Sequence, residues 1–208
     1  MDVIRRGLQS ADILLTTGGT SMGPTDLLKP VIERHFHGTI HFGRVAIKPG
    51  KPTTFATILF DGRIEKPVFA LPGNPASALV TFHVFVLPAL RRLSGFPNHT
   101  CQLPPVPVKV RRISLFLWQT KLIDFDLQQL MNDMLLDPRV EFHRVTVKAD
   151  RDGLKAYTTG GQRSSRITSL SGANALVVLP AKTAVLPERL YAGTMAGAIL
   201  IGEIQIEI

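Results

Sequence analysis

Short apolar runs separated by glycine- and proline-containing loops make up the first half of the chain. Such runs are typical of buried strands, and the turn residues between them mark where the strands end. The strands that we expect lie at residues 11–16, 44–48, 53–60 and 68–71. Residues 25–35 are expected to form a helix after the first strand. Strands and helices in this order predict a parallel or mostly parallel sheet with helices on its faces.

The longest apolar stretch of the chain follows the fourth of these strands. Asn74 suits the N-cap of a helix and Pro75 suits its first position, so the pattern predicts a helix over residues 75–93. Arg91 and Arg92 fall in its last turn, where cations are favoured. We expect its apolar part to be too short to span a bilayer, because His83 and Pro88 interrupt it.

The second half of the chain has strand character instead. A proline-rich linker after residue 96 separates an expected α/β domain (residues 1–97) from an expected β-barrel or sandwich (residues 103–208). The strands expected there lie at residues 106–113, 141–147, 154–159, 175–179 and 198–208. Residues 115–136 interrupt this pattern with leucines and methionines at helical spacing. This segment is either an inserted amphipathic helix or a misread stretch of sequence.

The charge balance points to an anionic partner. The chain has 24 Lys and Arg against 16 Asp and Glu, a net charge of +8. That excess suits nucleic acid, a phosphorylated small molecule, an inorganic oxyanion or a membrane surface. The basic residues are dispersed, with no arginine-aromatic stripe, so we expect no nucleic acid partner.

The remaining composition narrows the class of protein. A single cysteine, Cys101, excludes an internal disulfide framework and a multi-cysteine zinc site. The first residues lack the apolar core of a signal peptide. We therefore expect a soluble, cytoplasmic protein without membrane insertion.

Three loops at the ends of expected strands carry candidate chemistry, because ligands of α/β proteins bind at such ends. In the first loop, at residues 16–26, glycines allow the backbone to approach a ligand and Ser21 can donate a hydrogen bond. Asp26 could hold a hard cation such as Mg²⁺. A glycine turn with Asp26 as a helix cap explains this loop equally well. Its candidate glycines are Gly18, Gly19 and Gly23.

The second and third loops add further anion-binding groups. Residues 71–77 place Ser77 in the first turn of a helix, where anions are favoured, although helix capping alone would explain this loop. Residues 48–52 present Lys48 and Lys51 from a stiff turn of proline and glycine, which would otherwise be a solvated basic turn. Three such loops in one α/β unit favour a joint phosphate or oxyanion site.

Taken in order, these loops resemble gephyrin and the molybdopterin molybdenumtransferases, the MoeA family. The motifs that carry the resemblance are TGGTSMG (17–23), KPGKP (48–52) and LPGNP (71–75). HFGRV (41–45), PRVEFHR (138–144) and ANAL (173–176) fit the same family. The resemblance implies an incomplete three-layer α/β domain of the MoaB/Mog type followed by a small β-barrel-like domain.

The resemblance implies molybdenum cofactor biosynthesis, in which molybdate is inserted into adenylylated molybdopterin and AMP is released with the help of Mg²⁺. By motif matching, Lys48 and Lys51 would hold molybdate, with Arg144 contributed by the β domain. Asp26 would take the magnesium or phosphate role, and Ser21 and Ser77 would contact nucleotide or oxyanion. The remaining matched binding residues are Gly18, Gly19, Gly23, Gly50, Pro52, Gly73, Asn74 and Ser171.

The chain departs from the family pattern in two further respects. Family members carry two more subdomains and the first part of the α/β domain before the matched region, so we expect this portion to be inactive alone. The family often has a serine directly before Ala-Asn, where this chain has Gly172 preceded by Ser171.

Alternative functions remain open at this stage. The related molybdopterin adenylyltransferase module shares the α/β fold, although the KPGKP loop and the trailing β domain argue against it. Gephyrin-like proteins also anchor inhibitory receptors, so a receptor loop is a candidate partner and the chain a candidate scaffold. The family resemblance further implies a homodimer for the full-length protein.

Overall fold

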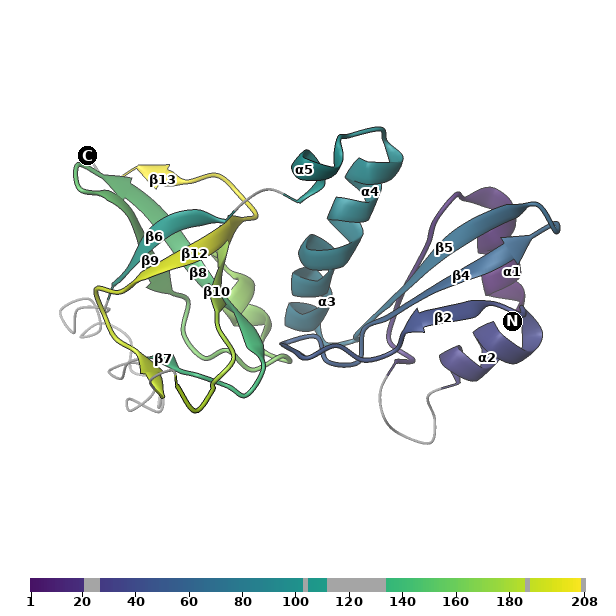
Figure 1. The fold of residues 1–208 in the computed structure, drawn as a ribbon, viewed down its shortest axis with the longest axis horizontal. Coiled ribbons are helices and arrows are strands. Elements are labelled where there is room, and N and C mark those ends of the chain that lie inside the picture. The colour runs from purple at the N-terminus through teal and green to yellow at the C-terminus, as the bar shows by residue number, and fades with distance from the viewer. Residues whose placement is uncertain (21–26, 103–104, 112–133, 186–187, 207–208) are drawn as a thin grey trace. The chain divides into compact units, whose positions relative to one another are not determined.

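The computed structural model describes residues 1–20, 27–102, 105–111, 134–185 and 188–206. The chain divides into two compact units, Met1–Cys101 and Gln102–Ile208, whose elements are labelled in Figure 1. Each unit is built around its own sheet.

The first unit has a sheet with the strand order β1-β5-β4-β2. Its strands are β1 (Leu14–Thr17), β2 (Thr39–Phe42), β4 (Thr54–Phe60) and β5 (Ile64–Leu71), and β3 (Ile47–Lys48) is a short strand outside this order. Its helices are α1 (Asp2–Ser10), α2 (Leu28–His35), α3 (Pro75–Thr81), α4 (Leu87–Leu93) and α5 (Asn98–Cys101).

The expectation of a mostly parallel sheet is wrong. Among the described strands of this unit, β1 and β5 pair in parallel, whereas β5 with β4 and β4 with β2 are antiparallel. The cause is the tight turn at Asp61 and Gly62, whose φ angles of 51° and 66° are those of a hairpin turn. A connection this short can only join antiparallel strands.

Both faces of this sheet are covered. Leu8 of α1 and Ile32 of α2 pack with Val68 of β5 on one face. Phe69, the next residue of β5, packs with Val86 on the other face. Because successive residues of a strand point to opposite faces, β5 contributes to both cores. This arrangement confirms the expected three-layer α/β architecture.

The expected helix over residues 75–93 is confirmed, with a local change of winding. Between α3 and α4 the chain forms a π-helical turn, Phe82–Val86, closed by a hydrogen bond from the Leu87 N–H to the Phe82 carbonyl. Pro88 lacks an N–H and would crowd the preceding turn of a regular α-helix. The wider π turn, placed directly before this proline, accommodates it.

The expectation that this apolar stretch is too short to span a bilayer is wrong in length and composition. Among the described residues, Pro75–Leu93 is one helical stretch of 19 residues that is long and apolar enough to cross a membrane. Core helices of soluble proteins meet the same criterion, and Val86 of this stretch packs on the sheet.

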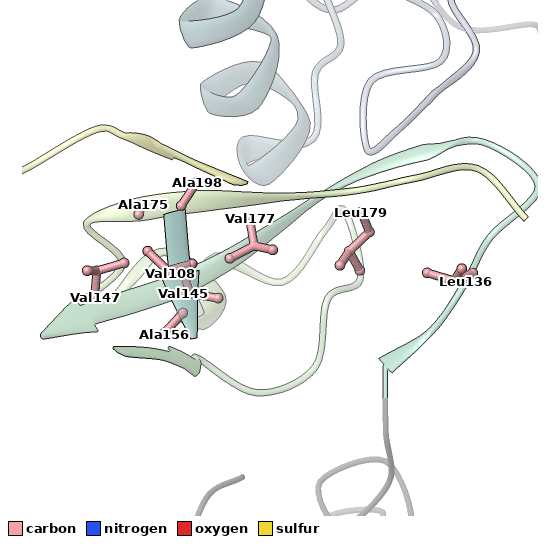
Figure 2. Close-up of a cluster of buried hydrophobic side chains, with 9 residues drawn as sticks. All are labelled: Val108, Leu136, Val145, Val147, Ala156, Ala175, Val177, Leu179 and Ala198. Atoms are coloured by element: carbon pink, nitrogen blue, oxygen red, sulfur yellow. The ribbon is translucent and has the colours of Figure 1, made fainter. Parts of the chain in front are cut away.

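The second unit is a closed barrel, which confirms the expected β-barrel-like domain. Its strands are β6 (Val106–Arg111), β8 (Val140–Asp150), β9 (Gly153–Thr158), β10 (Ala175–Leu179), β12 (Met195–Leu200) and β13 (Gln205–Ile206). The order β10-β12-β6-β9-β8 closes because β10 also pairs with β8. Figure 2 shows the buried core, which alternate residues of these strands fill, among them Val145, Val147 and Val177.

The predicted insertion at residues 115–136 lies outside the described residues as far as position 133. Its last part is not helical, because Met134 and Leu135 form the short strand β7, which pairs with β11 (Arg189–Leu190). Leu136 is buried in the barrel core.

Candidate functional site

The first loop leaves β1 through two glycines with left-handed backbone conformation. Gly18 and Gly19 have φ angles of 83° and 68°, which residues with side chains rarely adopt. The Gly18 N–H donates to the Leu71 carbonyl at 2.9 Å, and the Thr20 hydroxyl reaches the same carbonyl at 3.4 Å. These bonds fix the start of the loop against the end of β5. The predicted site residues Ser21, Gly23 and Asp26 lie outside the described residues.

The second loop adjoins the first. β1 and β5 are parallel neighbours, and their last residues, Thr17 and Leu71, lie side by side. A Cβ atom added to Gly73 would lie 3.4 Å from the Gly18 Cα, so the two loop backbones approach closely. The structure therefore brings Gly18 and Gly73 together.

The helix that begins after this loop carries two more predicted residues. Asn74 is the N-cap of α3 by position, although its side chain makes no capping hydrogen bond. Ser77 lies in the first turn and is 3% exposed. Asn74 and Ser77 thus lie just after the edge of the sheet at which the two glycine loops meet.

The lysine turn, residues 48–52, has a firmly held backbone. Thr53 donates to the Gly50 carbonyl from its N–H at 3.0 Å and from its hydroxyl at 2.7 Å. The Val45 N–H donates to the Lys51 carbonyl at 3.0 Å. The Lys48–Pro49 peptide bond is cis. Lys51 is exposed, Lys48 and Pro52 are half-buried.

Gly50 is required at the centre of this turn for two reasons. Its φ angle of 123° is strained for any residue with a side chain. A Cβ there would also lie 2.5 Å from Thr81 Cγ2 and 2.9 Å from Ile47 Cδ1. The turn is therefore packed tightly against helix α3.

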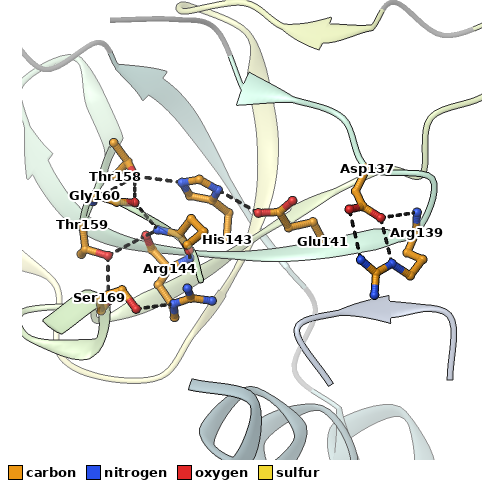
Figure 3. A network of polar contacts seen from close by, with 10 residues as sticks. Asp137, Arg139, Glu141, His143, Arg144, Thr158, Thr159, Gly160 and Ser169 are labelled. Atoms are coloured by element: carbon orange, nitrogen blue, oxygen red, sulfur yellow. Dashed lines mark hydrogen bonds and ion pairs between the residues drawn. The ribbon is translucent and has the colours of Figure 1, made fainter. Parts of the chain in front are cut away.

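Arg144 is a charged residue with no exposed surface. It lies on β8 next to Val145, a residue of the barrel core, and so points to the opposite face of the strand. Its Nε donates to the Ser169 hydroxyl at 2.9 Å (Figure 3). Its terminal nitrogens Nη1 and Nη2 are buried and have no hydrogen-bond partner among the residues that the structure describes.

Burial also changes the titration of this side chain. Desolvation lowers the pKa of the Arg144 guanidinium to about 10, and the carboxylate of Glu141 opposes that shift. A buried cation with unsatisfied donors is unfavourable unless an anion accepts from them. Two adjacent terminal N–H groups suit two oxygens of one oxyanion. Arg144 thus has the chemistry of an oxyanion-binding residue.

The contacts of Arg144 come from residues that the sequence did not single out. Ser169 lies on the 3-10 helix η3 (Ile167–Leu170) and is fully buried. The predicted Ser171 is exposed and follows this helix. Gly172 has a φ angle of 74°, which explains a glycine where family members often have serine.

His143 lies on the other face of β8 from Arg144. Its Nδ1 lies 3.3 Å from a Glu141 carboxylate oxygen, and its Nε2 lies 2.8 Å from the Thr158 hydroxyl (Figure 3). Nearby, the Arg139 guanidinium binds both carboxylate oxygens of Asp137 at 2.9 and 3.2 Å. Both ring nitrogens of His143 thus have partners on its own face of the strand.

Carboxylate, histidine and cysteine side chains do not gather into a metal centre in the described parts of the chain, where no group of three or more could hold an ion. Asp26, the predicted ligand of Mg²⁺, is not among these residues.

Both units match known families. Residues 2–92 match the family described as a probable molybdopterin binding domain, and residues 129–188 match the MoeA C-terminal region (domain IV). The two units are thus similar to consecutive regions of the proteins that include gephyrin and the molybdopterin molybdenumtransferases.

Individual relatives agree with this assignment. The chain is 43% identical to gephyrin from Dictyostelium discoideum over 94% of its own length, and 42% identical to the molybdenum cofactor synthesis protein cinnamon from Drosophila melanogaster over 85%. It is also 45% identical to a molybdopterin molybdenumtransferase from Haemophilus influenzae. That match covers 41% of this chain and 19% of the relative.

A solved structure has the same fold. The crystal structure of a molybdopterin biosynthesis MoeA protein from Pyrococcus horikoshii covers 97% of this chain with a TM-score of 0.61 and 25% identity. The chain corresponds to 40% of that protein, and to 26% and 25% of the length of gephyrin and cinnamon. It therefore spans only part of the proteins that it matches.

Proposed function

We propose that this chain carries the oxyanion-binding part of a molybdopterin molybdenumtransferase, which inserts molybdate into adenylylated molybdopterin with release of AMP. The observation that carries the proposal is Arg144, a fully buried guanidinium whose two terminal nitrogens have no partner in the described part of the chain. Molybdate is a dianion with several equivalent oxygens, so it can accept from both nitrogens at once. The names of the relatives, which refer to molybdenum cofactor synthesis and molybdenumtransfer, support this choice of oxyanion.

The first unit carries candidate anion-binding cations of its own. Lys48 and Lys51 stand on a turn whose backbone is held by Thr53 and by the close packing of Gly50. A backbone held in advance reduces the conformational freedom that the two lysines lose when they bind an anion. We assign molybdate binding and charge neutralisation to these lysines.

The glycine loops take the nucleotide part of the substrate. Gly18, Gly19 and Gly73 leave the backbone open to a ligand where β1 and β5 end, and Ser77 lies buried in the helix turn beside them. Ser21, Gly23 and Asp26 belong to this assignment by their sequence motif. Mg²⁺ enters the proposal only through Asp26, and we assign no step to it.

Calorimetric titration of molybdate, with AMP and Mg²⁺ present, tests the proposal. Saturable binding by the chain should be lost in the Lys48→Ala/Lys51→Ala double variant and, separately, in Arg144→Met. Lys109→Ala, which removes an exposed lysine of β6, is the matched control and should bind as the parent does. A folded parent chain that shows no saturable binding would contradict the proposal.

A scaffold function is the second candidate, favoured by the similarity to gephyrin over 94% of the chain. In this case the chain would bind the loop of an inhibitory receptor, and the full-length protein would act as a homodimer. Titration with such a peptide separates the two functions. A scaffold binds it equally well with and without Lys48 and Lys51, whereas the oxyanion site needs both lysines.

A further inference from the structure

The Ser169 hydroxyl has a fixed direction. Its Oγ donates its single proton to the Arg166 carbonyl at 2.7 Å. The oxygen lone pairs therefore face the Arg144 Nε, which donates to them at 2.9 Å. In the parts of the chain that the structure describes, this is the one hydrogen bond made by the Arg144 guanidinium.

This contact determines which edge of the guanidinium is left for a ligand. A guanidinium has five N–H groups in one plane, and Ser169 accepts the single one on Nε. The remaining four are on Nη1 and Nη2, and two of them are parallel at the end of the group. Rotation about the bond between Cδ and Nε would break the contact with Ser169. Ser169 therefore fixes the plane in which the ligand must lie.

The same segment, residues 159–170, also holds the backbone of Arg144. The Gln162 side-chain amide accepts from the Arg144 N–H at 2.8 Å and lies 3.2 Å from its carbonyl, to which it donates. The register of β9 with β8 ends at the neighbouring residue Val145, and beyond it the Arg144 carbonyl still accepts from the Thr159 N–H at 3.3 Å, so the Gln162 amide adds to the backbone bonding there. The Thr159 hydroxyl lies 3.0 Å from the Arg144 carbonyl and 2.7 Å from that of Ser169.

We propose that Ser169 is a positioning residue that orients the Arg144 guanidinium for end-on binding of an oxyanion. This role rests on the proposed function only for the identity of the oxyanion. Positioning differs from a purely structural role because Ser169 sets the direction of the Arg144 guanidinium. The hydrogen bond that sets this direction can be measured without any ligand.

The first test uses the ligand-free full chain and nuclear magnetic resonance of the arginine Nε–H groups. The Arg144 Nε–H should exchange slowly with water, and Ser169→Ala should accelerate that exchange at least tenfold. Ser165→Ala, in an exposed residue of the same segment, should leave it unchanged. Unchanged exchange in Ser169→Ala would overturn the proposal. If that variant does not fold, Ser169→Cys preserves the side-chain volume but accepts hydrogen bonds poorly, and it should give the same acceleration.

The second test measures molybdate affinity under the calorimetric conditions given above. Ser169→Ala should weaken binding about tenfold, and Ser169→Thr, which restores a hydroxyl, should recover part of it. Parent-like affinity in Ser169→Ala would overturn the positioning role while leaving the proposed function standing. If the parent chain itself binds no molybdate, the proposed function fails, and the exchange experiment alone decides whether Ser169 orients Arg144.

Discussion

The side-chain amide of Asn174 pairs with both backbone groups of Val147. Its Oδ1 accepts from the Val147 N–H at 2.6 Å and its Nδ2 donates to the Val147 carbonyl at 2.8 Å. The same Nδ2 donates to the Glu203 carbonyl at 2.8 Å. The Asn174 amide thus takes the place of a neighbouring strand at Val147 of β8. It also links β8 to the backbone at Glu203. This contact explains why an asparagine stands in the ANAL motif on structural grounds alone.

Asn174→Ala should lower the free energy of unfolding of the barrel by about 2–4 kcal/mol, because the two buried backbone groups of Val147 and the partly buried Glu203 carbonyl lose their partner. Urea unfolding measures the change. Gln205→Ala removes an exposed amide from the same barrel and is the control, with an expected effect within about 0.5 kcal/mol. Equal losses in the two variants would show that the Asn174 contacts contribute nothing specific.

Gly50→Ala should destabilise the first unit by about 3 kcal/mol, because the new Cβ meets Thr81 Cγ2 and the φ angle is unsuitable for alanine. Gly62→Ala is the control for backbone strain alone, since its φ is 66° and its Cβ position is open. It should lose about 1–2 kcal/mol.

A further substitution, Thr81→Ser, tests the steric part of the loss expected for Gly50→Ala. Thr81→Ser removes Cγ2 but keeps the hydroxyl that donates to the Ser77 carbonyl at 2.8 Å. The double variant Gly50→Ala/Thr81→Ser should therefore lose about 1 kcal/mol less than the sum of the single losses. Strict additivity in urea unfolding would exclude a clash between these two positions.

Lys66→Met should loosen helix α1 selectively. The buried Lys66 ammonium donates to the carbonyls of Leu8 and Ala11 at 2.6 and 2.9 Å, where α1 ends. Methionine keeps the apolar stem but leaves these carbonyls unpaired. Hydrogen exchange of the α1 amides should become about tenfold faster, while the amides of α2 serve as the internal control. Equal acceleration in both helices would indicate a global effect instead.

Elements with local signals could be predicted from the sequence. Asn74 and Pro75 mark the start of the long helix, and this part of the expectation is confirmed because caps depend on neighbouring residues only. The strand at residues 175–179 likewise coincides with β10. The antiparallel direction of β4 and β5 follows from the short Asp61-Gly62 turn, but the pairing of β2 could not be inferred in the same way. β2 is short and half-exposed, and it gave no strand pattern.

The candidate site was predictable only as far as its motifs reach. Gly18 and Gly73 come together because parallel strands end at a common edge, a rule that needs no coordinates. The partner of Arg144 was not predictable, since Ser169 is 25 positions away along the chain and belongs to no motif. Whether a buried donor finds an acceptor is a property of the tertiary structure, which local sequence does not encode.

Arg144→Met should make the ligand-free chain more stable near neutral pH. The pKa of Arg144 is about 10 in the folded chain, well below the ordinary value of a guanidinium. Below pH 10 the guanidinium is therefore charged in both the folded and the unfolded chain. The lowering of its pKa on folding corresponds to a cost of about 3 kcal/mol for burying the charge. Methionine removes this cost and one hydrogen bond, so we expect a gain of about 2 kcal/mol in the free energy of unfolding.

The pH dependence of this stability difference follows from the lower pKa of Arg144 in the folded chain. As the pH rises through 10, the folded parent chain releases the proton before the unfolded chain does, so the unfolded state binds more protons and the parent gains stability. The advantage of Arg144→Met should therefore shrink above pH 10. Urea unfolding at several pH values measures it, with the exposed Arg163→Met as the control. Molybdate should stabilise the parent and not Arg144→Met. A variant less stable than the parent at pH 7 without oxyanion would contradict the view that Arg144 is kept for binding at the expense of stability.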